Sequence, residues 1–106
     1  MINPNFYKQP VVIDSNQHRQ LKLAQAVQDW SVAADLNAIF LASVEFGDAC
    51  CEYPIVFVEA GKDEQTGKML VAPIAVMGVQ DKQNLYVDKG QWRASYLPAM
   101  VRAYPF

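Results

Sequence analysis

A polar turn bounded by glycines, with an apolar segment on each side, constrains the fold of this chain most. Ile55–Val58 is apolar and largely β-branched, and Met69–Ala72 is a second apolar run. The turn between them, Gly61–Gly67, holds no apolar side chain. Two such runs around a polar turn predict an antiparallel pair of strands. Because Ile55–Val58 is apolar on both faces, the pattern also predicts that it is a central strand.

Further short strands are expected on both sides of this pair. They are Phe6–Ser15, with its apolar run Val11–Ile13, as an arm or edge strand, then Arg19–Leu23, Trp30–Ala33, Ala38–Leu41, Ile74–Val79 after a bulge or break at Pro73, and Leu85–Val87 before a turn at Asp88–Gly90. Arg19–Leu23 alternates polar and apolar residues as a half-buried strand does, whereas Ala38–Leu41 is a short apolar run typical of a buried strand. The alanines in Asp29–Asp35 suit a helix equally well, and we favour a strand there.

Two short helices complete the prediction. Ser43 can cap a helix over Val44–Glu52, in which Phe46, Ala49 and Cys50 form one apolar stripe directed at the core. Pro98 begins a second helical turn that ends at Arg102. The sequence therefore predicts an α+β fold with a mainly antiparallel sheet of about five to six short strands and one or two short helices.

The composition fits one folded domain over residues 1–106, since 52% of the residues are hydrophobic and 19% are charged. The formal net charge of -2 lacks the basic excess of a nucleic-acid-binding protein, so no nucleic-acid partner is expected. Acidic residues dominate from Glu45 to Glu64, and basic residues dominate after Lys68. Two such faces would suit a complementary partner or a second copy, although a solvated surface is the simpler interpretation.

The sequence predicts a cytoplasmic protein without a membrane span. Met1–Lys8 lacks the charged and then apolar layout of a secretory signal. The longest apolar stretch, Met69–Val79, is broken by Pro73 and is shorter than the roughly 20 residues of a spanning helix. Secretion to the cell surface without a signal is the alternative. The adjacent Cys50 and Cys51 fit a reducing compartment, as a small apolar pair or as a redox pair.

No pattern for nucleophilic catalysis, nucleotide binding or metal binding is present, so we expect no cofactor and assign no catalytic residue and no metal ligand. His18 is the only histidine, and Asp14 and Arg19 lie near enough in sequence to orient it as a general base. Glu45 and Glu52, with Asp48 between them, share a helical face that could bind a hard cation or simply face solvent.

Aromatic and basic side chains concentrate towards the C-terminus, where they could stack on a sugar ring or on a peptide side chain. Packing in the core or at an interface is the alternative use of these aromatic rings. The residues that we expect to bind a ligand or partner are His18, Glu45, Trp92, Arg93, Tyr96, Arg102 and Tyr104, with Phe106 beside them.

Several blocks of the chain resemble the SapC family of bacterial proteins. These blocks are Tyr53–Phe57, Asn84–Asp88, Gly90–Trp92 and Tyr96–Phe106, with His18-Arg19 and Glu45-Phe46 similar to earlier blocks of the family. The family is named for a component linked to a paracrystalline surface layer, and its members often lie beside genes for halogenase-like and outer-membrane uptake proteins. The resemblance implies no reaction. Because similar proteins continue beyond the last block, it implies an N-terminal portion or a short member.

Two functions follow as hypotheses. The first is a non-enzymatic binding or assembly module that recognises a protein, peptide or glycan through a sheet edge and the C-terminal aromatic surface, with a homodimer as one form. The alternative is an enzyme acting on a peptide or sugar, with His18, Glu45 and Asp88 as acid-base residues. A domain that serves only to oligomerise is the third.

Overall fold

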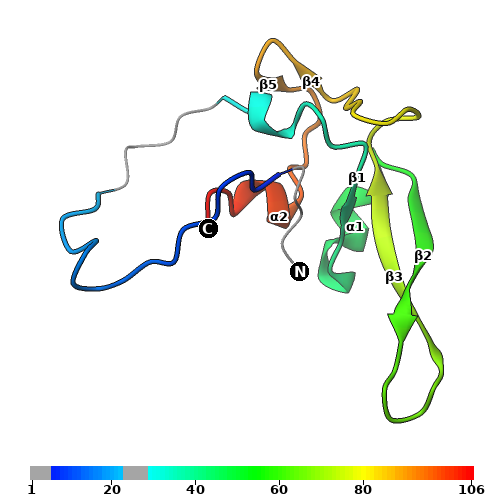
Figure 1. Cartoon of the computed structure of the whole chain (residues 1–106). Helices are drawn as coiled ribbons and strands as arrows, with labels where there is room; N and C mark the ends of the chain where they lie inside the picture. Colours follow the sequence, from blue (N-terminus) through cyan, green and yellow to red (C-terminus); the bar gives the residue numbers. More distant parts are fainter. Residues whose placement is uncertain (1–5, 23–28) are drawn as a thin grey trace.

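The computed structural model describes residues 6–22 and 29–106, which form an α+β fold (Figure 1). In this part of the chain, five strands form two antiparallel sheets, and the helices are short. In chain order the elements are η1 (Ser31–Ala33), β1 (Ala38–Phe40), η2 (Ser43–Glu45), α1 (Phe46–Ala49), β2 (Ile55–Lys62), β3 (Met69–Val76), β4 (Val87–Asp88), β5 (Gln91–Trp92) and α2 (Ala99–Arg102), where η marks a 3-10 helix. The fold class is the predicted one, with strands at the lower end of the expected number.

The larger sheet has the strand order β1–β3–β2, and all its pairs are antiparallel. The predicted pairing of β2 with β3 is confirmed, with Ile55 opposite Ala75 and Phe57 opposite Pro73. The prediction that Ile55–Val58 is central is wrong, because β2 lies at the edge and β3 lies in the middle. Beyond Glu59 the register shifts, and the hairpin ends in its polar turn.

Pro73 does not break or bulge its strand, contrary to prediction. β3 runs without interruption through this position. The backbone polar groups of a residue in an antiparallel strand point to one side. The Pro73 carbonyl accepts a hydrogen bond at 3.0 Å from the N–H of Leu41, the residue that follows β1. The backbone polar groups of Pro73 therefore face the β1 side of the sheet. The missing N–H of proline therefore removes no bond to β2.

The second sheet is a hairpin of β4 and β5, in which Val87 lies opposite Trp92. Its turn residues Lys89 and Gly90 have φ angles of 50° and 77°, the left-handed pair that closes a two-residue hairpin. The predicted turn is therefore confirmed. The strand before it begins at Val87 instead of Leu85.

The predicted helix over Val44–Glu52 is shorter than expected, since a 3-10 turn precedes α1 and the helix ends at Ala49. Phe46 and Ala49 pack in or against the core, but Cys50 is exposed like Cys51, so the apolar stripe is narrower than predicted. The favoured strand at Trp30–Ala33 is wrong: Ser31–Ala33 is a 3-10 turn, the helical alternative.

Residues 6–22 form an extended arm without regular strands (blue in Figure 1). The arm interpretation of Val11–Ile13 is thus confirmed, and all three residues are exposed. The described part of the predicted strand at Arg19–Leu23 consists of turn and loop, while Leu23 lies outside the described residues. Asp14 accounts for the turn, because its carboxylate accepts the N–H groups of Asn16 and Gln17 at 2.8 Å each.

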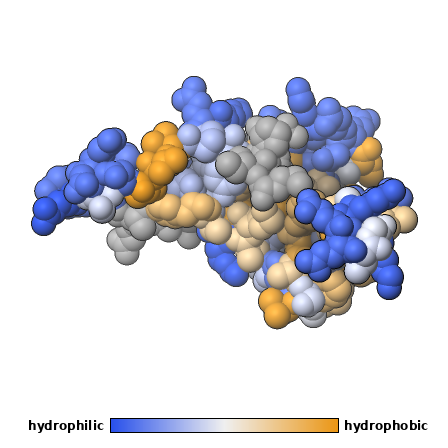
Figure 2. All heavy atoms as spheres, turned by 60° about the horizontal axis from the view of Figure 1, so that its bottom comes forward, coloured by the Kyte–Doolittle hydropathy of each residue, from blue (hydrophilic) through white to orange (hydrophobic). Residues whose placement is uncertain are grey.

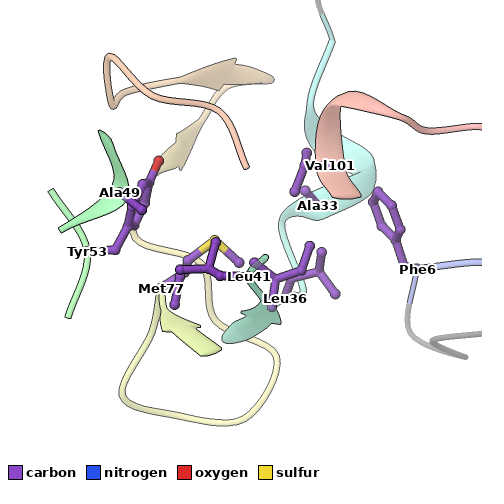
Figure 3. Close-up of a cluster of buried hydrophobic side chains, with 10 residues drawn as sticks. Phe6, Ala33, Leu36, Leu41, Ala49, Tyr53, Met77 and Val101 are labelled. Atoms are coloured by element: carbon purple, nitrogen blue, oxygen red, sulfur yellow. The ribbon is translucent and has the colours of Figure 1, made fainter. Parts of the chain in front are cut away.

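The core runs through the molecule as one connected cluster (Figure 3). At one end Ala49 and Tyr53 pack near Met77, and at the other Phe6 lies beside Val101 of α2. The N-terminal arm and the C-terminal helix therefore complete one core with the sheet.

Candidate functional site

Glu45 is a buried carboxylate that holds three groups from two parts of the chain. Its Oε2 accepts the N–H of Ala42 at 2.8 Å, which closes the turn before α1. Its Oε1 accepts the hydroxyl of Tyr96 and the N–H of Ala99, both at 2.8 Å. Ala99 is the first residue of α2, whose N-cap residue, Pro98, makes no side-chain cap. Glu45 therefore caps this helix from a distant segment.

The environment of Glu45 acts on its ionisation in two directions. Burial raises the pKa of the carboxyl, because a buried charge is costly. The hydrogen bonds from Ala99, Ala42 and Tyr96, together with the positive charge of Arg102, outweigh burial and lower the pKa below the ordinary 4.5. The carboxylate is thus held ionised as a structural acceptor.

Glu52 binds the same C-terminal segment one turn further along. Its Oε1 accepts the backbone N–H of Ser95 at 2.9 Å and its hydroxyl at 2.7 Å, and its Oε2 accepts the N–H of Tyr96 at 2.8 Å. These bonds, the one from the Ser95 N–H first, lower the pKa of Glu52. We call Glu45, Glu52 and the segment 95–99 that they hold the carboxylate clamp.

Aromatic side chains pack beside the clamp. Tyr53 donates its hydroxyl hydrogen to the carbonyl of Tyr96 and accepts the indole N–H of Trp92 at 2.9 Å. Burial raises the pKa of Tyr53 to about 12. Tyr86 stacks at a tilt on Tyr53, with centroids 4.6 Å apart, and donates its hydroxyl to the carbonyl of Glu52. Trp92 and Tyr96 thus pack internally, the alternative that the sequence left open.

A groove of about 1290 Å³ lies between the N-terminal arm and the C-terminal residues. We call it the arm–helix groove. Its described apolar lining includes Phe6, Val11, Ile13, Leu21, Val32 and Met100. Lys8, Lys22 and Asp35 supply charges at the same groove. An apolar groove with a few charged groups is the kind of surface that binds a ligand or a partner segment.

An aromatic cluster forms one wall of this groove. Phe6 packs on Tyr104 with ring centroids 4.8 Å apart, and Tyr7 lies 5.6 Å from the same ring. The Tyr7 hydroxyl donates to the carbonyl of Phe106 at 2.9 Å. The predicted C-terminal aromatic surface is therefore divided: Tyr104 and Phe106 line the groove, whereas Trp92 and Tyr96 lie at the clamp.

The polar candidates occupy separate places. His18 lies on the arm, where its Nδ1 accepts the N–H of Asp14 at 2.9 Å. Arg93 pairs with Asp88 at 2.5 Å across the β4–β5 hairpin, with both side chains about half exposed. The structure does not bring His18, Glu45 and Asp88 together, since they lie on the arm, before α1 and on β4 (Figure 1). Arg102, in the last turn of α2, is near enough to Glu45 to act on its charge.

Residues 6–22 and 29–106 contain no group of three histidine, cysteine, aspartate or glutamate side chains placed to hold a metal ion. Glu45 and Glu52 both bind backbone and hydroxyl groups, so the cation hypothesis for this helical face gains no support. Within the same described ranges, no helix has the length and apolar character needed to cross a membrane.

Glu45, Trp92 and Tyr96 were predicted as site residues from the sequence, but the contacts that join them were not. Glu52 was not predicted as a residue that holds the C-terminal segment. The available signal for Glu52 was its position one helical turn beyond Asp48, but that spacing was interpreted as a possible cation site. The groove was also missed, because the arm residues that line it carry no recognisable motif. The one sequence signal for a binding surface on the arm was the apolar run Val11–Ile13, which the structure leaves exposed.

The fold and the clamp together define a small α+β protein whose C-terminal segment is fastened to a helical turn before the central hairpin. The SapC family model matches residues 13–106, which covers the clamp, both sheets and both α-helices. The chain belongs to the SapC family. Searches among curated proteins and among solved structures found no match.

Proposed function

We propose that this SapC-family chain is a non-enzymatic binding or assembly module that takes an extended peptide segment of a partner protein into the arm–helix groove. The carrying observation is the groove itself, with apolar side chains along its walls and charges from Lys8, Lys22 and Asp35. Its size suits several residues of a peptide more than a single small molecule. The exposed arm supplies Val11 and Ile13, which are 71% and 59% exposed, as apolar contacts.

The clamp supports this proposal by fixing one wall of the groove. Glu45 holds the first residue of α2, the groove residue Met100 follows directly after it, and Tyr104 lies just past the end of the helix. A wall fixed before binding reduces the entropy lost when a partner docks. The family's link to surface layers extends the proposal to surface-layer or uptake assemblies. A glycan is the second class of ligand that we propose for the groove. We propose that the chain acts in the cytoplasm, before any export.

The enzyme hypothesis has less support. A general acid and a general base must reach the same substrate together. The three acid-base candidates, His18, Glu45 and Asp88, instead form bonds with different groups in different segments of the chain. Glu45 is held ionised by the bonds that it accepts, which favours a structural role over proton transfer.

A displayed library of random peptides tests the proposal, with neighbouring arm residues as matched variants. Val11 lines the groove, whereas Val12 is 88% exposed and does not. Peptides selected on the wild-type chain should bind Val11→Asp at least about tenfold more weakly, because the new charge must be desolvated. They should bind Val12→Asp unchanged. Equal effects of the two substitutions, or no selected peptide, would overturn the proposal.

A further inference from the structure

The charges at the arm–helix groove are unequal. Lys8 and Lys22, both on the arm, line the groove together with Asp35, so its lining carries two positive charges and one negative charge. All three side chains are exposed. In the part of the chain that the structure describes, none of them takes part in an ion pair, and the pair found there joins Arg93 to Asp88. The groove therefore offers uncompensated charges to whatever it binds.

The arm is basic over residues 6–22. Arg19 adds a third positive charge to it, and Asp14 is its carboxylate. That carboxylate lies outside the groove lining, and it already accepts the N–H groups of Asn16 and Gln17 at 2.8 Å each. The wall of the groove that the arm forms is therefore positive.

Apolar side chains lie beside the two lysines. Val11 and Ile13 follow Lys8 along the arm, Leu21 precedes Lys22, and all of them line the groove. Figure 2 shows hydrophilic residues over the outer turn of the arm, at the left of the view, with hydrophobic residues directly beside them. A lysine packs its methylene groups on apolar neighbours and keeps its ammonium group in water. A ligand that fills the groove therefore meets apolar and positively charged surface together.

We infer that the peptide segment bound in the arm–helix groove is acidic as well as apolar, with aspartate or glutamate carboxylates placed against Lys8 and Lys22. This inference rests on the function proposed above and names the kind of partner that the groove selects. Asp35 follows η1 on a different wall and repels carboxylates there, so the acidic side chains of the segment should project towards the arm. An exposed ion pair strengthens binding by at most about fivefold. The two lysines therefore determine which apolar peptides bind more than how tightly they bind.

Selection from a displayed library of random peptides tests the inference, with a charge-reversed arm and a matched hairpin variant. Peptides selected on the wild-type chain should combine apolar residues with at least about twofold more aspartate and glutamate than the unselected library holds. The arm variant, Lys8→Glu with Lys22→Glu, should lose this acidic excess because the arm wall is then negative. The hairpin variant, Lys62→Glu with Lys68→Glu, changes the net charge equally at two exposed lysines outside the groove, and it should keep the excess.

The affinity of one selected acidic peptide gives a second readout, measured by fluorescence anisotropy. Its dissociation constant on the wild-type chain should rise at least about threefold between about 50 and 500 mM salt, because salt screens exposed charges. Replacing the acidic residues of the peptide by their amides should weaken wild-type binding to a similar extent. The same replacement should leave binding to the variant Lys8→Gln with Lys22→Gln nearly unchanged, since the partners of the carboxylates are absent there.

Circular dichroism shows whether the arm variant folds, and the salt series on the wild-type chain needs no variant if it does not. Selected peptides without an acidic excess, or an affinity that salt leaves unchanged, would overturn this inference while the proposed function stands. Loss of the excess on the hairpin variant as well would also overturn it, since net charge and not the groove would then select the peptides. A library that yields no bound peptide would overturn the proposed function and this inference together.

Discussion

The carboxylate of Glu45 accepts the hydroxyl hydrogen of Tyr96 at 2.8 Å, a bond between residues 51 positions apart in the chain. Around it, Glu45 also satisfies the N–H groups of Ala42 and Ala99. One buried side chain thus connects the turn before α1 with the start of α2. The resulting clamp determines where the C-terminal residues meet the arm.

Removal of this carboxylate should destabilise the whole fold. Glu45→Ala leaves two N–H groups and one hydroxyl without their acceptor, which should cost about 3 kcal/mol in the free energy of unfolding. Asp48, on the exposed surface of α1, provides the matched variant, and Asp48→Ala should change stability by less than about 0.5 kcal/mol. Urea denaturation measures both. Equal stabilities of the two variants would contradict the role of the clamp.

Acid should weaken the clamp. The folded pKa values of Glu45 and Glu52 lie below the ordinary 4.5, so their contribution to stability is present above pH 4.5 and is lost as the pH falls through the folded values. Denaturation midpoints measured from pH 7 down to pH 3 should therefore fall. In Glu45→Gln the fall should be smaller but present, because Glu52 and several aspartates also have lowered pKa values. An unchanged slope would argue against ionised Glu45.

High pH should destabilise the fold through ionisation of Tyr53. Its pKa rises from 10.0 to about 12 in the folded chain, so the stability that it contributes is present below pH 10 and is lost between pH 10 and 12. Ultraviolet absorbance should report a tyrosine that ionises late, together with unfolding. Tyr53→Phe should reduce this late absorbance change without abolishing it, because burial also raises the pKa of Tyr96, whereas Tyr104→Phe, at the groove wall, should retain it in full.

The β4–β5 turn depends on Gly90. Its φ of +77° is strained for other residues, and a Cβ there would lie 2.6 Å from the carboxylate oxygen of Asp29. Gly90→Ala should therefore cost more than about 1 kcal/mol. A Cβ added at Gly47, in α1, would meet no atom within 4 Å, so Gly47→Ala should be neutral or stabilise by up to roughly 1 kcal/mol. Thermal denaturation of the pair measures the contrast.

The parts of the fold that the sequence predicts well are local. The β2–β3 pair and the turn at Asp88–Gly90 depend on residues close together in the chain, and both were recoverable from turn chemistry and apolar runs. Ser31–Ala33 was misassigned because three residues are too few to show a period. The edge position of Ile55–Val58 was misassigned because both faces of this strand are apolar, a pattern that is more typical of a central strand.

The candidate site was predictable only as separate residues. Glu45 and Tyr96 were both selected, but nothing in a pattern joins residues so far apart, and the bond depends on the packing of the whole core. The groove depends in the same way on Tyr104 meeting Phe6 across nearly the full chain. Long-range contacts of this kind carry no periodic signal in a single sequence.

The separation of Glu45 from Ala99 also sets an order of events during synthesis. The β2–β3 hairpin is complete once Val76 has left the ribosome, and it can form from neighbouring residues alone. The acceptor at Glu45 must wait, in contact with water, until Ala99 is made, 54 positions later. A nascent chain therefore carries the Glu45 carboxylate without its partner in α2 until Ala99 is made, and a segment synthesised later fixes a structure that formed earlier.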